Sequence, residues 1–327
     1  MRKQVLVIAL SIITLAINAT IWRVTKDASF LPHFGNLQHA IDSCGVGDTI
    51  YVYPGNYSSI EIKKQLAIFG VGYFIAENAK DSLTSFASTS NVDNVTFSTG
   101  SDFSLISGIS VGGITCNNVN NITISGNKYG GISLNNTKYL TIKKNIGGSI
   151  TGIRCSNALI SNNIWSGGGQ TNGVNFDEYS NVILQNNYLQ CRIVIYNSIV
   201  FNNIEDYNPR SYDYNWYYLY SSSLNNCNLM SNISTNGTFG SGSNNFSASF
   251  EQLYPNGVSA DNYKLPQNSI AKGKGLGGVD CGPFGGDDPY CLSGLNYIPT
   301  IAKLSMPIKA NGNNGLPVKV IVKSNKP

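Results

Sequence analysis

A small charged cluster in the middle of the chain could act on an acidic polysaccharide. Arg154, Asn175 and Asp177, with Glu178 beside them, fall on one face of the repeats described below. In a polysaccharide lyase, an arginine or lysine neutralises the carboxylate of the substrate, and a base removes the neighbouring proton. Other lyases use Ca²⁺ held by carboxylates for the first task. The alternative interpretation is a surface ion pair between Arg154 and Asp177, worth at most about 1 kcal/mol.

A run of aromatic residues offers a second kind of chemistry, the binding of sugars. Arg210 is followed by Tyr212, Tyr214, Trp216 and Tyr218. Flat rings with polar edges stack on the faces of sugar rings, and Arg210 could bind their hydroxyl groups. The alternative is that the rings cover the side of the fold, where burial of apolar surface stabilises by about 25 cal/mol per Å².

The sequence contains few of the histidines and clustered carboxylates that other catalytic sites and metal sites require. Both histidines, His33 and His39, precede the repeats, and the Asp287–Asp288 pair lies in a late loop. Hydrolases that use several carboxylates are therefore a poor match, and we expect no metal site. No cofactor is predicted, except Ca²⁺ if the chain is a lyase. Lys143 and Lys144 are a further pair of cations, but adjacent lysines are more typical of a solvated corner.

The elements that would position these residues are repeats. Between residues 114 and 203, five segments each contain a short alternating apolar run, a polar break, a second run and an asparagine. The alternation has period two and β-branched residues are frequent, which predicts strands. A repeat of about 20 residues that ends at a turn residue predicts a stack of coils, because one coil alone cannot bury its apolar side. We therefore expect a parallel β-helix with at least five coils.

Aligning the repeats predicts which side chains face inward. The first runs place Cys116, Leu134, Cys155, Phe176 and Ile195 in one inward column. The second runs place Ile124, Ile142, Leu184 and Phe201 in another, with Ile160 as a rougher match. Arg154 and Asp177 then flank the first column on the outer face, and Cys116 and Cys155 are predicted to be small buried residues.

Each repeat closes on an asparagine. These residues are Asn127, Asn145, Asn163, Asn187 and Asn203. Asparagine tolerates left-handed backbone angles and can bond its own backbone in tight turns. Asn127, Asn145 and Asn163 could form a ladder of side-chain amides, or they could act as independent turn residues, and the sequence favours neither.

Two stretches outside the repeats carry a family resemblance. The first is Leu37-Gln-His-Ala-Ile-Asp followed by Gly47-Asp-Thr-Ile-Tyr-Val-Tyr-Pro-Gly-Asn-Tyr, and the second runs from Asn262-Tyr-Lys-Leu-Pro to Asp280-Cys-Gly-Pro-Phe-Gly-Gly. Together they resemble secreted bacterial proteins of the pectate-lyase-like superfamily. The resemblance implies an all-β fold, a right-handed parallel β-helix (solenoid) with a short N-terminal capping helix near residues 37–45. It implies no single activity, since the superfamily includes lyases, hydrolases and adhesins.

Three segments divide the chain. Residues 1–19 have a short basic start, an apolar stretch and a small residue at Ala19, which is typical of a signal peptide. Residues 20–297 form the predicted β-helix domain, including the cap and a loop excursion at 205–220. Residues 298–327 form a small C-terminal β-hairpin or tail, because two strand-like runs flank a turn. No segment predicts a membrane span, and we expect the protein to be secreted or held at the cell surface.

Composition narrows the range of partners. Charged residues make up 12% of the chain and the net charge is +4, so nucleic acid is not expected as a partner. Seven cysteines remain after export, and Cys281 and Cys291 flank a Gly-rich loop, so we expect a disulfide between them.

The regular stack and the incomplete catalytic sets favour a secreted, non-catalytic protein. It would bind polysaccharide or a cell-surface glycan, or serve as a structural component of the cell surface or matrix. The alternative is a polysaccharide lyase or a related carbohydrate-active enzyme, acting on acidic polysaccharide through Arg154, Asn175 and Asp177. The sequence leaves the oligomeric state open.

Overall fold

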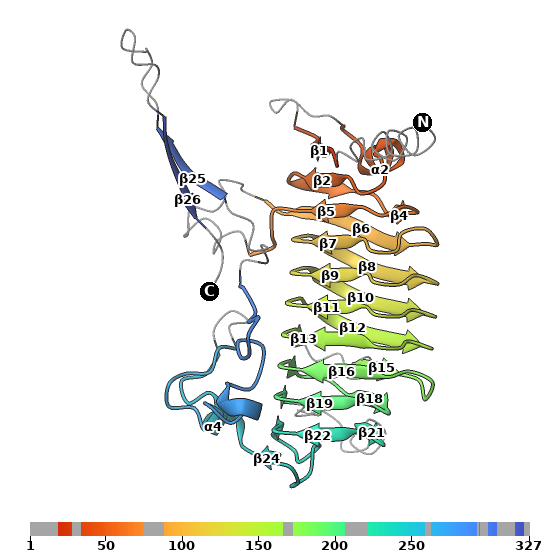
Figure 1. Ribbon diagram of the computed structural model, residues 1–327. Helices are drawn as coiled ribbons and strands as arrows, with labels where there is room; N and C mark the ends of the chain where they lie inside the picture. The colour runs from red at the N-terminus through yellow and green to blue at the C-terminus, as the bar shows by residue number, and fades with distance from the viewer. Residues whose placement is uncertain are drawn as a thin grey trace, which may run out of the picture.

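Short strands stack in parallel into two long sheets that run along the molecule (Figure 1). The computed structural model describes residues 19–27, 34–74, 88–165, 173–206, 222–258, 263–292, 294, 300–305 and 318–323. Within these residues the two sheets have 10 and 14 strands, and neighbouring coils pair in parallel. The predicted all-β parallel β-helix is confirmed.

The first sheet, called sheet A, contributes one strand to each coil. Its strands are β1 (Ile21–Val24), β2 (Thr49–Val52), β5 (Ala67–Phe69), β7 (Leu105–Ser107), β9 (Thr123–Ser125), β11 (Thr141–Lys143), β13 (Ala158–Ser161), β16 (Val182–Gln185), β19 (Ile199–Phe201) and β22 (Asn228–Met230). The central residue of each middle strand is apolar and buried, so each coil contributes one side chain to the core.

The second sheet, called sheet B, carries each coil along two arms. In the middle coils one long strand forms both arms: β6 (Ser90–Phe97), β8 (Ser110–Asn117), β10 (Lys128–Asn135) and β12 (Ile146–Ile153). Elsewhere the first arm is β3 (Gly55–Tyr57), β14 (Ile164–Trp165), β17 (Tyr188–Leu189), β20 (Ile204–Glu205), β23 (Ile233–Ser234) and β24 (Phe246–Ser247). The second arm is then β4 (Ile60–Ile62), β15 (Val174–Phe176), β18 (Ile193–Tyr196) and β21 (Ser223–Asn225).

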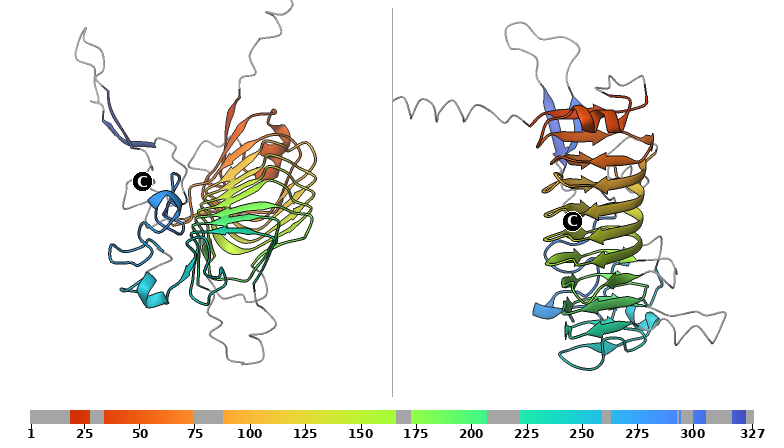
Figure 2. Two further views of the ribbon diagram at one scale, coloured as in Figure 1. Left: turned by 60° about the horizontal axis from the view of Figure 1, so that its bottom comes forward. Right: turned by 90° about the vertical axis from the view of Figure 1, so that its right-hand side faces the viewer.

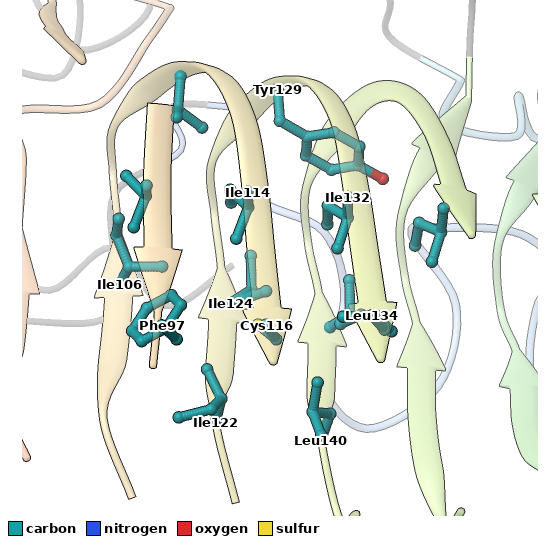
Figure 3. Packing of buried hydrophobic residues seen from close by; sticks show 14 of the residues in the cluster. Phe97, Ile106, Ile114, Cys116, Ile122, Ile124, Tyr129, Ile132, Leu134 and Leu140 are labelled. Atoms are coloured by element: carbon teal, nitrogen blue, oxygen red, sulfur yellow. The ribbon is translucent and has the colours of Figure 1, made fainter. Parts of the chain in front are cut away.

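The core lies between the sheets, where inward side chains from both meet. Figure 3 shows Ile106 and Ile124 of sheet A facing Phe97, Cys116 and Leu134 of sheet B, and all five are buried. Apolar residues at every second strand position therefore produce one continuous core along the stack.

The register corrects one predicted inward column. Gly152, and not Cys155, stacks between Leu134 and Phe176. Cys155 is buried in the turn after β12, where the Thr137 hydroxyl donates to its Sγ at 3.3 Å. A Cβ at Gly152 would lie 2.3 Å from the Phe176 ring, so the large ring occupies the space that a side chain would fill. The sequence pattern missed this position because glycine has no apolar side chain to mark it.

The column on sheet A needs a smaller correction. Ile160 stacks directly on Ile142, so it is a full member and not a rough match. Val200, and not Phe201, stacks on Leu184. Val200 stands three residues before Asn203, just as Leu184 stands three residues before Asn187, so the spacing to the asparagine identifies the inward residue.

Glycine marks the corner between the two arms of sheet B. The register between neighbouring coils is interrupted at Gly112, Gly130 and Gly148. A Cβ at Gly148 would lie 2.0 Å from the carbonyl oxygen of Gly130, and one at Gly130 would lie 2.3 Å from that of Gly112. The close stacking of coils at this corner therefore requires residues without side chains.

A buried asparagine ladder forms the corner between sheet A and the first arm. Side-chain amides donate along the series Asn127, Asn145, Asn163, Asn187, Asn203, Asn232 and Asn245, with Nδ2 to Oδ1 distances of 3.2, 3.0, 3.0, 2.9, 3.0 and 3.1 Å. Each Oδ1 also accepts the main-chain N–H of the preceding ladder residue, as in Asn145 N to Asn163 Oδ1 at 3.0 Å. The ladder interpretation is correct, and it extends over more coils than the sequence indicated.

Both ends of the core are covered. The predicted capping helix is α2 (Leu37–Ser43), which buries Leu37, Ala40 and Ile41 and begins at Asn36, whose side chain accepts the N–H of His39 at 3.0 Å. At the other end, the loop between β23 and β24 buries Phe239 in the same cluster as the interior. Apolar caps of this kind protect an open stack from association with other chains.

Residues 263–292, here called the C-terminal strap, run back along the asparagine corner (Figures 1 and 2). Asn202 accepts the N–H of Leu276 at 2.7 Å, and the side chain of Asn162 donates to the carbonyl of Pro283 at 3.0 Å. Farther along, Tyr290 reaches Tyr73 through a hydrogen bond between their hydroxyl groups. The strap therefore connects coils that are far apart in the stack.

An ion cluster fixes the strap to the middle coils. Lys143 Nζ lies 2.8 Å from Asp288, and Lys144, with only 9% of its side chain exposed, pairs with the same carboxylate. The expected solvated corner is therefore wrong for Lys144. Burial lowers the pKa of Lys144, although the Asp288 carboxylate opposes this change. Burial alone would raise the pKa of Asp288, but hydrogen bonds from both lysines outweigh it and lower that pKa.

Acid is expected to release the strap. Because the pKa of Asp288 is lower in the folded state than its ordinary 3.8, its contribution is complete above that value and is lost as pH falls through the folded pKa. Asp288 is 41% exposed on its side chain, so the contribution is about 1 kcal/mol or less. Limited proteolysis between pH 7 and about pH 3 measures it. In the Asp288→Asn variant, the protease should cut the strap faster at neutral pH than in the native protein, and acidification should change the cutting rate less. Equal cutting rates of the two proteins at neutral pH would contradict the role of Asp288 in holding the strap.

The C-terminal hairpin is present, but the predicted disulfide is not. Strands β25 (Thr300–Ser305) and β26 (Lys319–Lys323) pair antiparallel as a separate two-stranded sheet. Cys281 and Cys291 form no disulfide, and Cys281 is buried with its Sγ donating to the carbonyl of Ser231 at 3.3 Å. Contacts with the coils thus hold the loop that the disulfide was expected to close.

Among the described residues, no helix is long and apolar enough to cross a membrane.

Candidate functional site

The outer surface of the second arm carries one column of polar side chains in register. From coil to coil the column consists of Thr96, Thr115, Ser133, Thr151, Asn175, Val194 and Ser223. All but Val194 end in a hydroxyl or an amide, and each is exposed or half-buried. Parallel strands hold such groups about 4.8 Å apart on a rigid surface.

A second outward column lies two residues farther along each strand. It contains Asn117, Asn135, Ile153, Tyr196 and Asn225. The residues between the two columns, such as Cys116 and Leu134, point inward and are buried. These two outward columns together are called the polar face; charged residues continue it at two positions, Glu61 in register with Thr96 and Asp177 two residues after Asn175.

The structure places Arg154 beside this face and not on it. Arg154 lies in the turn after β12 with φ of 54°, and the equivalent turn residues of the two preceding coils, Asn118 and Asn136, have φ of 53° and 52°. Its side chain is exposed. Arginine thus occupies a left-handed turn position that asparagine fills in the neighbouring coils, and its guanidinium is available at the edge of the polar face.

Asp177 reaches the same turn through the main chain of Arg154. Its two carboxylate oxygens accept the Arg154 N–H at 3.0 and 3.1 Å, and the Ser180 hydroxyl donates to one of them. In the two preceding coils this turn N–H instead bonds a strand carbonyl, such as that of Ile153. Asp177 therefore replaces a main-chain acceptor where the turn becomes longer. Among the described residues, no ion pair joins the Arg154 guanidinium to Asp177.

The structure brings Arg154, Asn175 and Asp177 to one edge of the stack. Asn175 is an exposed member of the polar face, with Thr151 and Val194 on either side of it. The Asp177 carboxylate already accepts the Arg154 N–H of the neighbouring coil and the Ser180 hydroxyl of its own turn, which is a poor arrangement for a general base. In the described part of the chain, no three His, Cys, Asp or Glu residues gather closely enough to hold a metal ion.

Two tyrosines at this edge were not among the predicted site residues. Tyr179 is 70% exposed in the turn that begins at Asp177, and Tyr196 ends β18 on the next coil. The Asn197 side chain donates to the carbonyl of Glu178 at 3.2 Å, which joins the two turns. The signal was present in the sequence, because Tyr179 is an aromatic residue in an otherwise polar break. Arg154, Asp177, Tyr179 and Tyr196 are called the rim.

The predicted sugar-binding run lies outside the described residues. This applies to Arg210, Tyr212, Tyr214, Trp216 and Tyr218. The strands that flank it are described: it follows β20 of the first arm and precedes β21, which pairs with β18 of the second arm. In the sequence, the run therefore stands between a strand of the first arm and a strand of the second arm.

Comparisons with known proteins do not add a function. No family model matches the chain, and no curated protein or solved structure shows significant similarity to it. The functional argument therefore rests on the polar face and its rim.

Proposed function

We propose that this protein is a secreted, non-catalytic parallel β-helix of the pectate-lyase-like superfamily that binds an extended glycan along its polar face. Residues 1–19 would direct its export, and the mature protein would act at the cell surface or in the matrix. The observation that carries the proposal is the in-register column of hydroxyl and amide groups from Thr96 to Ser223.

The chemistry of that column matches an extended polysaccharide. A glycan chain presents hydroxyl groups at a regular repeat of one sugar, and the column presents donors and acceptors at a regular repeat of about 4.8 Å. Each hydrogen bond to a neutral hydroxyl contributes little, about 1 kcal/mol, so affinity would come from several coils acting together. Because the strands are rigid, little side-chain entropy is lost on binding.

The rim supplies the apolar contact that sugar rings require. Tyr179 and Tyr196 place aromatic rings next to the polar face, and Arg154 adds a donor fork. The aromatic run from Tyr212 to Tyr218 would extend this contact where it joins the last strand of the face.

A lyase remains the second candidate, because Arg154 and Asn175 are exposed on the same edge. A non-catalytic function is favoured because both Asp177 oxygens bind the Arg154 N–H and one also binds Ser180. Asp177 is therefore a poor general base, and a lyase would have to use the exposed Glu178 beside it.

Removing the Tyr179 ring is expected to weaken glycan binding about fivefold to tenfold, since a stacked ring contributes about 1 kcal/mol. The mature protein is incubated with pectate, alginate, glycosaminoglycans and neutral glucans, with and without Ca²⁺, and dissociation constants are measured by calorimetry. Phe201→Ala is the matched control, because Phe201 is a half-buried aromatic residue at the end of β19 on sheet A, at the corner away from the rim.

The same incubations separate the two candidates. Product is followed by the ultraviolet absorbance of unsaturated sugars. Unsaturated product whose formation Arg154→Ala abolishes would establish the lyase and overturn the non-catalytic proposal. Absence of binding to every glycan, or binding that Tyr179→Ala and Phe201→Ala change equally, would remove the polar face and rim as the site.

A further inference from the structure

A cavity of about 660 Å³ opens at the asparagine corner of the last coil. One wall comes from the end of the stack and the other from the strap. The lining residues are Ser231, Asn244, Asn245, Phe246 and Ile270, together with residues 273–278. Its volume is in the range of sites that hold small organic molecules. Sheet A strands end at this corner, whereas they begin at the rim, so the cavity is separate from the glycan site proposed above.

The charge of the cavity is positive. Lys274 is the one ionisable side chain among its described lining residues, and it is exposed. The nearby Asp280 is compensated, because Lys272 Nζ lies 2.5 Å from its carboxylate and the N–H of Gly273 donates to it at 2.9 Å. Lys274 therefore presents a cation with no acidic neighbour in the lining.

Part of the cavity wall is apolar, within a lining of mixed polarity. Phe246 lies on β24, the terminal strand of the described sheet B path, so no further coil covers its outer side. Ile270 and Leu276 are 41% and 50% exposed beside it. Exposed apolar side chains that gather at a concave site, and not singly on a convex surface, are typical of a binding site.

Main-chain groups complete the lining. Gly277 and Gly278 have φ of 77° and 79°, and nothing lies within 4 Å of a Cβ built at either residue. A ligand can therefore approach the N–H and carbonyl groups of this loop without meeting side chains. Asn244 adds a side-chain amide that is exposed at the mouth.

We propose that this cavity binds a small organic carboxylate with an apolar face. The carboxylate would pair with Lys274, the body of the ligand would lie against Phe246 and Leu276, and Asn244 would bind a further polar group. Two sources share this chemistry: an acidic sugar, free or at the end of a glycan, and an aromatic acid. Either would be recognised by one cation above an apolar wall.

Four probes test the proposal on the full mature chain: glucuronate and its neutral counterpart glucose, and benzoate and its neutral counterpart benzamide. We expect at least one acid to bind about tenfold more tightly than its neutral counterpart, because a charge-assisted contact is lost in the latter. Preference for glucuronate would identify a sugar acid, and preference for benzoate an aromatic one. Equal binding within both pairs, or no binding of any probe, would overturn the proposal.

Four variants locate the binding. Lys274→Gln should weaken the preferred acid about tenfold, and Leu276→Asp should weaken it more, because it places a like charge at the mouth. Lys128→Gln removes an equally exposed charge on β10 and should change nothing. Tyr179→Ala should also leave this affinity unchanged, which separates the cavity from the polar face. Equal effects of Lys274→Gln and Lys128→Gln would show that only net charge matters and would overturn the site.

Discussion

Asn163→Ala is expected to destabilise the protein by about 3–5 kcal/mol, one of the two largest effects of a single substitution that the structure predicts. Asn163 is fully buried, and its Oδ1 accepts both the main-chain N–H and the side-chain amide of Asn145 at 3.0 Å. Its Nδ2 donates to the carbonyl of Ile142 at 2.9 Å and to Asn187 at 3.0 Å. Alanine leaves several buried donors and acceptors without partners, and each costs about 1–3 kcal/mol.

Urea unfolding followed by circular dichroism measures this loss. Asn135→Ala is the matched control, because Asn135 is exposed on β10 and its change should stay within about 0.5 kcal/mol. Asn163→Asp is a second test, because a carboxylate can accept the same bonds but cannot donate to Ile142 and must be buried as a charge or as an acid. If either Asn163 variant unfolds at the urea concentration of the native protein, the ladder does not contribute to stability.

Gly148→Ala is expected to destabilise the fold by about 3 kcal/mol or more, because the new Cβ would lie 2.0 Å from the carbonyl oxygen of Gly130. The obstacle is main chain on the neighbouring coil, so no side-chain rotation relieves it. The coils would have to separate at the corner between the two arms, which would break their shared ladder of hydrogen bonds.

Gly242→Ala provides the control for this substitution. Nothing lies within 4 Å of a Cβ built at Gly242, so alanine should be neutral or stabilising by up to about 1 kcal/mol. Thermal unfolding of both variants gives the comparison. Similar melting temperatures for the two variants would contradict the close contact at the corner.

The sequence predicted the stack because its coils repeat two simple requirements. Strands need an apolar residue at alternate positions, and the asparagine corner needs a residue that can bond the coils on either side. Both requirements recur within a few residues, as at Ile142 and Asn145. The register at Gly152 was not predictable in this way, because the side chain that fills its place belongs to Phe176 on the next coil.

The rim and the strap depend on contacts that are distant in sequence. Asp177 was correctly associated with Arg154, but its bond to the Arg154 N–H depends on a left-handed turn that no apolar pattern reveals. Asp288 is separated from Lys143 by 145 residues, and only the path of the strap brings them together. The sequence shows Tyr179 as an aromatic residue in a polar break, but its exposure depends on the longer turn in which it lies.

The path of the strap also determines where mechanical load enters the molecule. The chain leaves the stack near Tyr73, beside the first coils, and continues to the β25–β26 hairpin. A pull on the hairpin would therefore reach Tyr290 first, then Asp288, then the bonds of Asn162 and Asn186 in turn. These contacts would bear the load one after another before tension reached β24 and the last coil. The strap would therefore detach and extend before the coils unfolded, and the polar face on the coils would stay intact.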